Sequence, residues 1–405
     1  MPYLNPLVLS FRTPPAVRPQ SILIGKMMAE WQRQGTNPVI ITYDNNGDWT
    51  TNLDVYNIPQ FRVSRYFNNR YINKIFPIKY WLEDLYYQKI FKITKKIIKK
   101  NQPNIVFSFS NPYASNILGA MIKKRLKIPF VAYFSDPWYD DPYQNFTYIE
   151  KVKIAHLEKF IVKYADKVIF CNQVARKLVM KKYPQEWFDK SDIVPHCFDP
   201  SDYPKPTQNP LTADHKFAIS HIGAFYPERN PKPLFKALRI ALEKSPELKT
   251  EIKLNLIGGA SNYTGYKLND LKNLLKSYKL DSITDIIPPV KYKQSLQYMV
   301  DSDLLVVIDA NFEHSPFLTS KVIDYLGSGN PIIGITPNNS PTDNLLTQVG
   351  YKSFTYTEIN QLANYLQTAI KNKTKIKPNQ TAISQYDVQN TTKKLLKIFT
   401  QILSE

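Results

Sequence analysis

The chain has 405 residues, 43% hydrophobic and 21% charged, which is enough for two or three globular domains and excludes a disordered or fibrous protein. Its 53 basic residues outnumber 34 acidic ones, and the net charge of +19 favours an anionic partner such as nucleic acid, an acidic membrane or a phosphorylated substrate. There is no run of about 18 apolar residues and no basic signal-peptide start, and two cysteines are too few for a disulfide framework, so we expect a cytoplasmic protein.

Short apolar strands alternate with helical patterns along the first 200 residues. The expected strands are 7–11, 37–43, 104–110, 129–134, 166–171 and 191–195, and the expected helices are 18–34, 80–100, 113–126, 147–164 and 173–183. This alternation predicts a doubly wound parallel sheet, so residues 1–200 are expected to form a first Rossmann-like domain of the α/β class.

A proline-rich polar stretch, Pro200–Pro210, indicates a linker, after which the alternation begins again. The second set of expected strands is 216–223, 252–259, 283–287, 303–308 and 331–335, with helices beginning near Pro231, Leu268, Gln294 and Lys321. We therefore predict a second Rossmann-like domain over 201–378, with ligands bound in a cleft beyond the carboxyl ends of the strands.

The segment from Ser315 to Gly334 places a cation and an acid on one short helix between two buried strands. Lys321 and Asp324 are three residues apart, so they share a helix face near the N-terminus, where the helix dipole favours anions. A diphosphate beside a ribose would suit this pair, although the same spacing is also common in solvated surface pairs.

Two further segments place polar side chains after buried strands. In His221–Leu238, a strand ends at Gly223 and a loop carries Arg229 to the start of a helix, where it either binds an anion or is an exposed loop arginine. In Pro129–Tyr143, Asp136 follows a buried strand at its carboxyl end, where it either serves a site or caps the following turn.

The spacing Lys-x-x-acid-Tyr-Leu-x-x-Gly-x-Pro, from Lys321 to Pro331, resembles the donor-binding signature of GT-B glycosyltransferases of family four. The resemblance implies two Rossmann-like domains facing across a cleft, a C-terminal helix within 379–405 that returns to the first domain, and retaining transfer of a sugar from a nucleotide-diphosphate sugar. In that family the acid holds the ribose hydroxyls. Asp324 stands where the family more often has Glu, and Pro316 replaces an earlier Glu that helps to hold the sugar.

The same resemblance assigns the donor side. Arg229 falls at the second of two diphosphate-binding cations, Ala224 stands at the first, and Lys321 would supply the missing charge. The donor-side residues are expected to be Gly223, Arg229, Gly258, Val290, Tyr292, Ser320, Lys321 and Asp324, with Val290 and Tyr292 in the loop that packs against the nucleobase.

On the acceptor side, Pro129–Tyr143 resembles the Asp-x-x-Asp-Pro-Trp loop of a subset of the family. It implies acceptor-side roles for Asp136 and Trp138, and Arg18 at the first helix start is a third candidate. Asp136, Arg229 and Lys321 are the expected catalytic residues.

No metal or cofactor is expected besides the donor substrate. The five histidines show no helical pair, and Asp301-Ser302-Asp303 matches the metal motif of the other glycosyltransferase fold but only joins a helix to a strand.

From Phe61 to Lys100, eleven basic residues are interleaved with aromatic ones against only two acidic residues. Leu82, Tyr86, Ile90, Ile93 and Ile97 recur at helical spacing, which predicts a helix with a lysine-coated outer face. The part from Arg62 to Trp81, including Arg65 and Arg70, lacks that period and suits an anionic membrane surface, where we expect peripheral association.

The predicted function is therefore transfer of a sugar to a glycan or lipid-linked acceptor in cell-surface polysaccharide or glycolipid synthesis. A basic nucleic-acid-binding protein, which is disfavoured, and a GT-B nucleotide-sugar epimerase remain the alternatives. The sequence leaves the sugar, nucleobase, acceptor, linkage and oligomeric state open.

Overall fold

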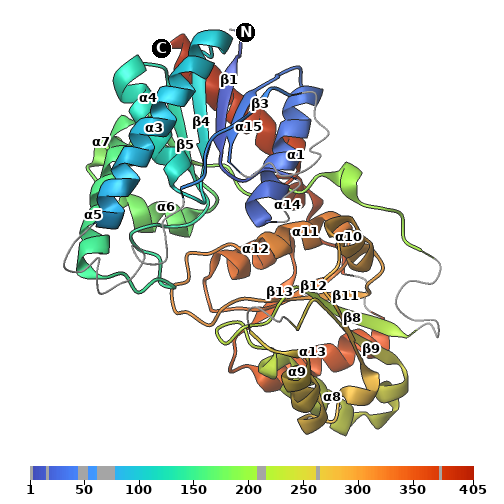
Figure 1. Cartoon of the computed structure of the whole chain (residues 1–405). Helices are drawn as coiled ribbons and strands as arrows, with labels where there is room; N and C mark the ends of the chain where they lie inside the picture. The colour runs from blue at the N-terminus through green and yellow to red at the C-terminus, as the bar shows by residue number, and fades with distance from the viewer. Residues whose placement is uncertain are drawn as a thin grey trace. The chain divides into compact units, whose positions relative to one another are not determined.

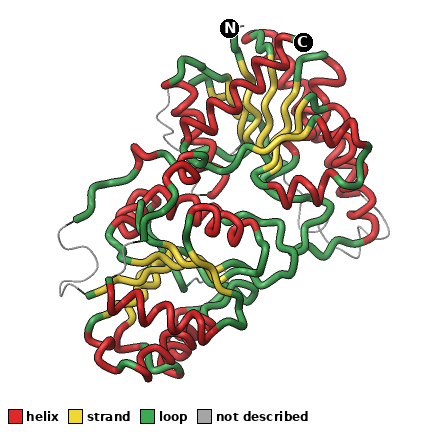
Figure 2. Tube along the Cα trace, turned by 180° about the vertical axis from the view of Figure 1, so that it is seen from behind, coloured by secondary structure: helices red, strands yellow, loops and turns green. Residues whose placement is uncertain are grey.

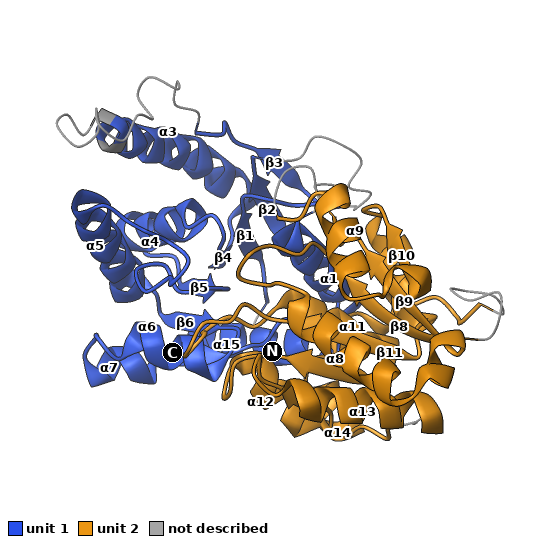
Figure 3. Cartoon of the chain, turned by 90° about the horizontal axis from the view of Figure 1, so that it is seen from below, with its two compact units in different colours: residues 1–196, 388–405 blue, residues 197–387 orange. Residues whose placement is uncertain are grey.

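The computed structural model describes residues 3–14, 18–43, 53–61, 78–207, 216–260, 265–373 and 376–405. They form two compact units, unit 1 with residues 1–196 and 388–405 and unit 2 with residues 197–387 (Figure 3). The boundaries predicted from the sequence lie after residues 200 and 378, whereas the units change after residues 196 and 387. Arg62, Arg65 and Arg70 of the expected membrane segment lie outside the described residues.

Unit 1 contains a parallel sheet of seven strands in the order β3-β2-β1-β4-β5-β6-β7 (Figure 1). The strands are β1 Pro6–Ser10, β2 Val39–Thr42, β3 Val55–Asn57, β4 Ile105–Phe109, β5 Phe130–Phe134, β6 Lys167–Phe170 and β7 Ser191–Ile193. The order reverses between β1 and β4, which makes the carboxyl ends of these strands the expected ligand edge of the unit.

Helices cover both faces of this sheet (Figure 2). They are α1 Pro19–Arg33, α3 Ile78–Asn101, α4 Ala114–Leu126, α5 Tyr148–Tyr164, α6 Gln173–Met180, α7 Gln185–Asp189 and α15 Val388–Ser404. Alternate residues of β4 point to opposite faces, so Val106 lies in the core beneath α3, α4 and α5 while Phe107 contacts Trp31 of α1 and Phe399 of α15. These contacts return the C-terminal helix to unit 1, as predicted.

The predicted apolar stripe of α3 is confirmed, because Tyr86, Ile90 and Ile97 are buried and Ile93 packs against the same core. Exposed lysines cover the outer surface of the helix.

Unit 2 contains a second parallel sheet, in the order β10-β9-β8-β11-β12-β13. Its strands are β8 Phe217–Ile222, β9 Ile252–Ile257, β10 Thr284–Ile287, β11 Leu304–Ile308, β12 Ile332–Ile335 and β13 Lys352–Phe354. In order of appearance this is 3-2-1-4-5-6, the arrangement of dinucleotide-binding folds, and the reversal between β8 and β11 marks the ligand edge.

One face of this sheet carries α8, α9 and α13, and the other carries α10, α11 and α12 (Figure 1). The helices are α8 Lys232–Lys244, α9 Leu268–Ser277, α10 Tyr292–Val300, α11 Ser320–Ser328, α12 Pro341–Val349, α13 Ile359–Asn372 and α14 Gln380–Ser384. The doubly wound prediction is confirmed for both halves.

The predicted linker, Pro200–Pro210, is wrong over its first residues, because they fold onto unit 2. Asp199 caps a short 3₁₀ helix at Pro200–Asp202. The ring of Tyr203 fills the space above Gly327, where a Cβ would lie 2.4 Å from it. The prediction failed because a proline-rich composition indicates a lack of long helices and strands. It gives no information about tertiary contacts.

Candidate functional site

A group of charged side chains gathers in unit 2 where the strand order reverses. Gly223 directly follows β8 and Asp309 directly follows β11, so both lie at the carboxyl edge between these neighbouring strands. Lys321, in the first turn of α11, extends over Gly223, where a Cβ would lie 2.3 Å from the lysine Nζ. A side chain at residue 223 would force the lysine out of this position.

Lys321 is a cation whose charge is easily lost. Burial and then the neighbouring Arg229 lower its pKa to about 7, while Asp309 opposes the shift. A bound anion would favour the protonated form, so the lysine is suited to respond to an incoming phosphate.

Arg229 is placed by a tight turn after β8. Its backbone amide donates to the Tyr226 carbonyl at 2.8 Å, and its guanidinium lies 5.0 Å from the centre of the Tyr226 ring. One guanidinium nitrogen, Nη2, is 4.0 Å from Asp309 Oδ1, and both side chains are nearly buried. The arrangement excludes the exposed-loop interpretation of Arg229.

Asp309 is a site residue that the sequence reasoning missed. Burial raises the pKa of this carboxyl, and Arg229 is the largest opposing influence. The available signal was an acid directly after the apolar strand DLLVVI, at the carboxyl edge where functional side chains collect in such folds.

His221 completes the inner wall of the site and was also missed. Its Nδ1 is 2.9 Å from the Val306 carbonyl, and its ring stacks on Phe225 at 4.4 Å. Burial and then Lys321 hold its pKa well below the ordinary range, so the imidazole is neutral at physiological pH. The positive charge of this edge therefore comes from Arg229 and Lys321.

Asp324 lies one helical turn from Lys321 and is held from two directions. Tyr292 donates its hydroxyl to Asp324 Oδ1 at 3.1 Å, and Tyr203 donates to the Asp324 backbone carbonyl at 2.7 Å. Burial and then the Asp324 charge raise the pKa of Tyr292, so this tyrosine stays a hydrogen-bond donor. Tyr292 opens α10 beside the acid instead of lying in a loop, and its expected nucleobase contact stays a prediction.

The remaining expected donor residues adjoin the same edge. Gly258 follows β9 with φ +68°, and a Cβ there would lie 3.9 Å from the Gly223 Cα. Val290 follows β10, and Ser320 is the first residue of α11, whose N-terminus has no side-chain cap. In unit 2 the residues predicted for the donor thus lie after the strands of the sheet and in the first turns of α10 and α11.

Replacing Gly223 with alanine is expected to lower the free energy of unfolding by about 1–3 kcal/mol, because φ is +128° and the new methyl group would collide with Lys321. Denaturant unfolding monitored by circular dichroism measures this loss. Gly329→Ala is the matched control, since its φ is +76° but nothing lies within 4 Å of the added Cβ. If the free energy of unfolding fell no more than in this control, Lys321 would move aside for the added methyl group without destabilising the protein.

Asp136 occupies the carboxyl edge of the unit 1 sheet. The Asn111 amide donates to its Oδ2 at 3.2 Å, and the Tyr113 hydroxyl donates to its backbone carbonyl at 2.5 Å. Burial, followed by the nearby Asp141 charge, raises the pKa of Asp136 to about 6. Among the described residues, no backbone amide donates to this carboxylate, so the turn-cap interpretation is not supported.

Trp138 lies against the inner side of the same loop. Its ring stacks on Tyr113 at 4.3 Å with an interplanar angle of 2°. Since Tyr113 also holds the Asp136 carbonyl, Trp138 fixes the loop through Tyr113. Its predicted acceptor contact stays a prediction.

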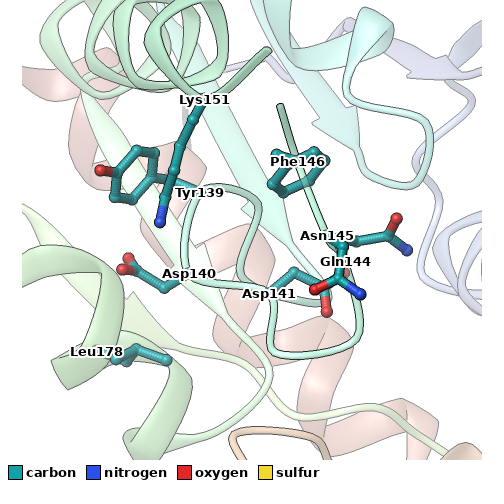
Figure 4. Close-up of a pocket in the computed structure, with 8 residues that line it drawn as sticks. All are labelled: Tyr139, Asp140, Asp141, Gln144, Asn145, Phe146, Lys151 and Leu178. Carbon is teal, nitrogen blue, oxygen red and sulfur yellow. The ribbon is translucent and has the colours of Figure 1, made fainter. Parts of the chain in front are cut away.

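The loop continues into a pocket of about 440 Å³ (Figure 4). Its lining combines two aromatic rings, two carboxylates, two amides and a lysine with one leucine: Tyr139, Phe146, Asp140, Asp141, Gln144, Asn145, Lys151 and Leu178. Lys182 neutralises Asp140 and also bonds the buried Glu158 at 2.8 Å.

Arg18 is exposed at the N-terminal boundary of α1, where its carbonyl accepts a hydrogen bond from the Ile22 amide. Because α1 follows β1, Arg18 lies toward the same sheet edge as Asp136.

Within the described part of the chain, no three His, Cys, Asp or Glu side chains gather where they could hold a metal. The Asp-x-Asp motif has structural partners, because Asp301 accepts from Thr207 and Asp303 accepts from the Ala218 amide. No described helix is long and apolar enough to cross a membrane.

Comparison with known proteins gives one family and one fold. Residues 21–202 match Glycosyltransferase Family 4. No curated protein has a significantly similar sequence.

Three solved structures illustrate the fold. A sucrose-phosphate synthase from Thermosynechococcus elongatus has 13% identity and a TM-score of 0.70, with 99% of this chain and 100% of that chain covered. The lipopolysaccharide outer core galactosyltransferase WaaB has 14% identity and a TM-score of 0.64, with 98% and 100% covered. A putative UDP-N-acetylglucosamine 2-epimerase from Listeria monocytogenes has 10% identity and a TM-score of 0.62, with 97% and 95% covered.

At these identities the structures establish the fold but not the reaction. Evidence for the reaction comes from the family match and from the site. Residues 21–202 carry the family match, and the two Rossmann-like units have the GT-B fold, so the chain is a glycosyltransferase with this fold.

Proposed function

We propose that this enzyme transfers a sugar from a nucleotide-diphosphate sugar to a glycan or lipid-linked acceptor, with retention of configuration, in the synthesis of a cell-surface polysaccharide or glycolipid. The observation that carries the donor class is the pair of nearly buried cations, Arg229 and Lys321, above Gly223 at the switch point of the unit 2 sheet. Fixed cations at this edge suit a diphosphate, and the acid one helical turn away suits a ribose.

In this proposal Arg229 and Lys321 act on the leaving group. Negative charge develops on the diphosphate as the bond to the sugar breaks, and fixed cations among buried side chains stabilise that charge without reorganising. Asp309 positions Arg229, and Tyr292 positions the Asp324 carboxylate. Asp136 of unit 1 is assigned to the reacting sugar or the acceptor.

The relatives support sugar chemistry of this kind. One is a sucrose-phosphate synthase and another a galactosyltransferase of lipopolysaccharide outer core. We therefore place the acceptor among sugars and glycans, including those joined to lipid.

The test is a thermal-shift screen of nucleotide sugars, followed by transfer assays with the donor that binds. A ligand at one hundred times its dissociation constant adds about 2.7 kcal/mol of stability, which such a screen detects readily. Donor consumption that requires an acceptor supports the transferase, whereas interconversion of the free nucleotide sugar would assign an epimerase. Steeply salt-dependent nucleic-acid binding without turnover would favour the nucleic-acid alternative.

Replacing Asp324 with asparagine is expected to weaken donor binding by roughly tenfold while the melting temperature stays near that of the native protein. A carboxylate accepts hydrogen bonds from both ribose hydroxyls, whereas an amide offers one acceptor and adds a donor. Calorimetric titration of both proteins with the donor and its 2′,3′-dideoxy analogue measures the effect. If the native protein bound the dideoxy analogue as tightly as the donor, the ribose assignment would be wrong.

A further inference from the structure

Exposed apolar side chains of unit 1 concentrate at the beginnings of two helices. Seven large hydrophobic residues of the described chain are exposed, and five of them lie on α3 and α5. On α3, Trp81 is 63% exposed and Leu85 follows one turn later. On α5, Tyr148 is 83% exposed, Ile149 follows it directly, and Val152 lies one turn later. We call these five residues the apolar patch.

Ion pairs hold the two halves of the apolar patch together. Lys153 Nζ lies 2.9 Å from Glu83 Oε2 and 3.7 Å from Asp84 Oδ1. Both acids lie between Trp81 and Leu85 along α3, and Lys153 follows Val152 on α5, so the exposed groups of the two helices are neighbours. Figure 1 shows the first turns of α3 and α5 close together.

The apolar patch lies at the functional edge of unit 1. In a parallel sheet each connecting helix begins at the carboxyl ends of the strands, so the first turns of α3 and α5 belong to that edge. The chain runs from Asp136 through the pocket-lining residues 139–146 directly into Tyr148. A surface that contacts the apolar patch is thereby next to the loop of Asp136.

The charge around the apolar patch selects an anionic partner. Helix α3 carries seven lysines against Glu83 and Asp84, and both of these acids are paired with Lys153. Trp and Tyr combine an apolar ring with a polar tip and are favoured where lipid headgroups meet acyl chains, while Leu, Ile and Val suit the acyl region. Lys79 and Lys89 on α3 and the exposed Lys151 on α5 lie within about one turn of patch residues along their helices, so the apolar patch and these cations together match an anionic bilayer surface.

We propose that unit 1 docks on an anionic lipid bilayer through the apolar patch, with the carboxyl edge of its sheet turned toward the lipid. The docking does not depend on the proposed function. The corollary that docking presents a lipid-linked acceptor to Asp136 does rest on the proposed function.

Co-sedimentation of the whole chain with vesicles tests the proposal. Binding to phosphatidylcholine vesicles containing phosphatidylglycerol is expected to exceed binding to pure phosphatidylcholine and to fall with added salt. The triple variant Trp81→Gln, Leu85→Gln and Val152→Gln is expected to lose roughly tenfold or more of the partition coefficient. Leu268→Gln is the matched control, because Leu268 is 44% exposed on α9 of unit 2, and its binding should not change.

The depth of insertion has a separate readout. Quenching of tryptophan fluorescence by brominated lipid is expected in the native protein and should largely disappear in Trp81→Phe, which keeps an apolar ring and hence most of the binding. Equal melting temperatures would show that each variant is folded, since every replaced side chain is exposed.

Unchanged vesicle binding in the triple variant, or equal recovery with neutral and anionic vesicles, would overturn the proposal. Concentration-dependent dimers in sedimentation velocity that the triple variant abolishes, without lipid binding, would assign the apolar patch to a second copy of the chain and would also overturn it. Transfer to a soluble acceptor is assayed separately, so a protein that binds lipid but transfers no sugar would reject the proposed function and leave the docking standing.

Discussion

Replacing Asp136 with asparagine is expected to lower the rate of sugar transfer by about 100-fold or more and to leave the affinity for the donor nearly unchanged. The substitution keeps the size of the side chain and leaves Asn111 beside it. It removes the negative charge and replaces one carboxylate oxygen with an amide nitrogen, so the side chain can no longer accept a proton. Donor binding should survive because the expected donor residues lie in unit 2. Steady-state kinetics and calorimetric titration of the same preparation separate the two effects.

The pKa of Asp136 makes this prediction sharper. Since burial and Asp141 raise it to about 6, the carboxylate is ionised above that pH, and transfer should decline as the pH falls through it. Asp141→Asn removes the second of these causes, so it should lower the pKa of Asp136 and move the acid limb of the profile to lower pH. An unchanged transfer rate in Asp136→Asn would reduce this residue to a structural role in its loop.

Replacing Arg229 or Lys321 with alanine is expected to weaken the binding of the nucleoside diphosphate by about 1.5–3 kcal/mol for each cation, the range of hydrogen bonds to charged groups. The free nucleoside should be affected far less, because both cations are assigned to the phosphates. Calorimetric titration with the diphosphate and the nucleoside of the donor measures the difference. Equal losses for the two ligands would refute the phosphate assignment.

The lowered pKa of Lys321 adds a pH dependence to the same experiment. In the unliganded protein the lysine is charged below about pH 7 and becomes neutral above it. A diphosphate prefers the charged form, so its affinity should fall by up to about tenfold per pH unit above pH 7, with uptake of about one proton on binding. Lys321→Met should abolish this slope, whereas Lys232→Met, at the start of α8, is a control that should retain it.

Much of the donor edge could be predicted from the sequence because it depends on local patterns. A buried strand followed by a glycine places a loop at the carboxyl edge of a parallel sheet, and this rule located Gly223, Gly258 and Arg229 without knowledge of any contact. The helix that carries Lys321 and Asp324 was predicted as one short helix between two buried strands, and it spans Ser320–Ser328. The short strands β3 and β13 were missed, since none of their residues is fully buried and neither carries the apolar run by which strands were recognised.

The sequence by itself determined which segments alternate between strand and helix and which residues follow the strands. These two facts predict the two doubly wound sheets and the edge on which the donor residues lie. Only the tertiary structure decided which distant groups meet there. Tyr203 donates a hydrogen bond to Asp324, which is 121 positions away in the sequence, and Asp309 pairs with Arg229. Periodicity also identified the buried stripe of α3, but not that Trp81 and Leu85 stay exposed beside the start of α5. The physical reason is that a periodic pattern records how a residue is oriented on its own helix or strand, whereas burial, pKa and pairing depend on side chains that the rest of the chain brings near.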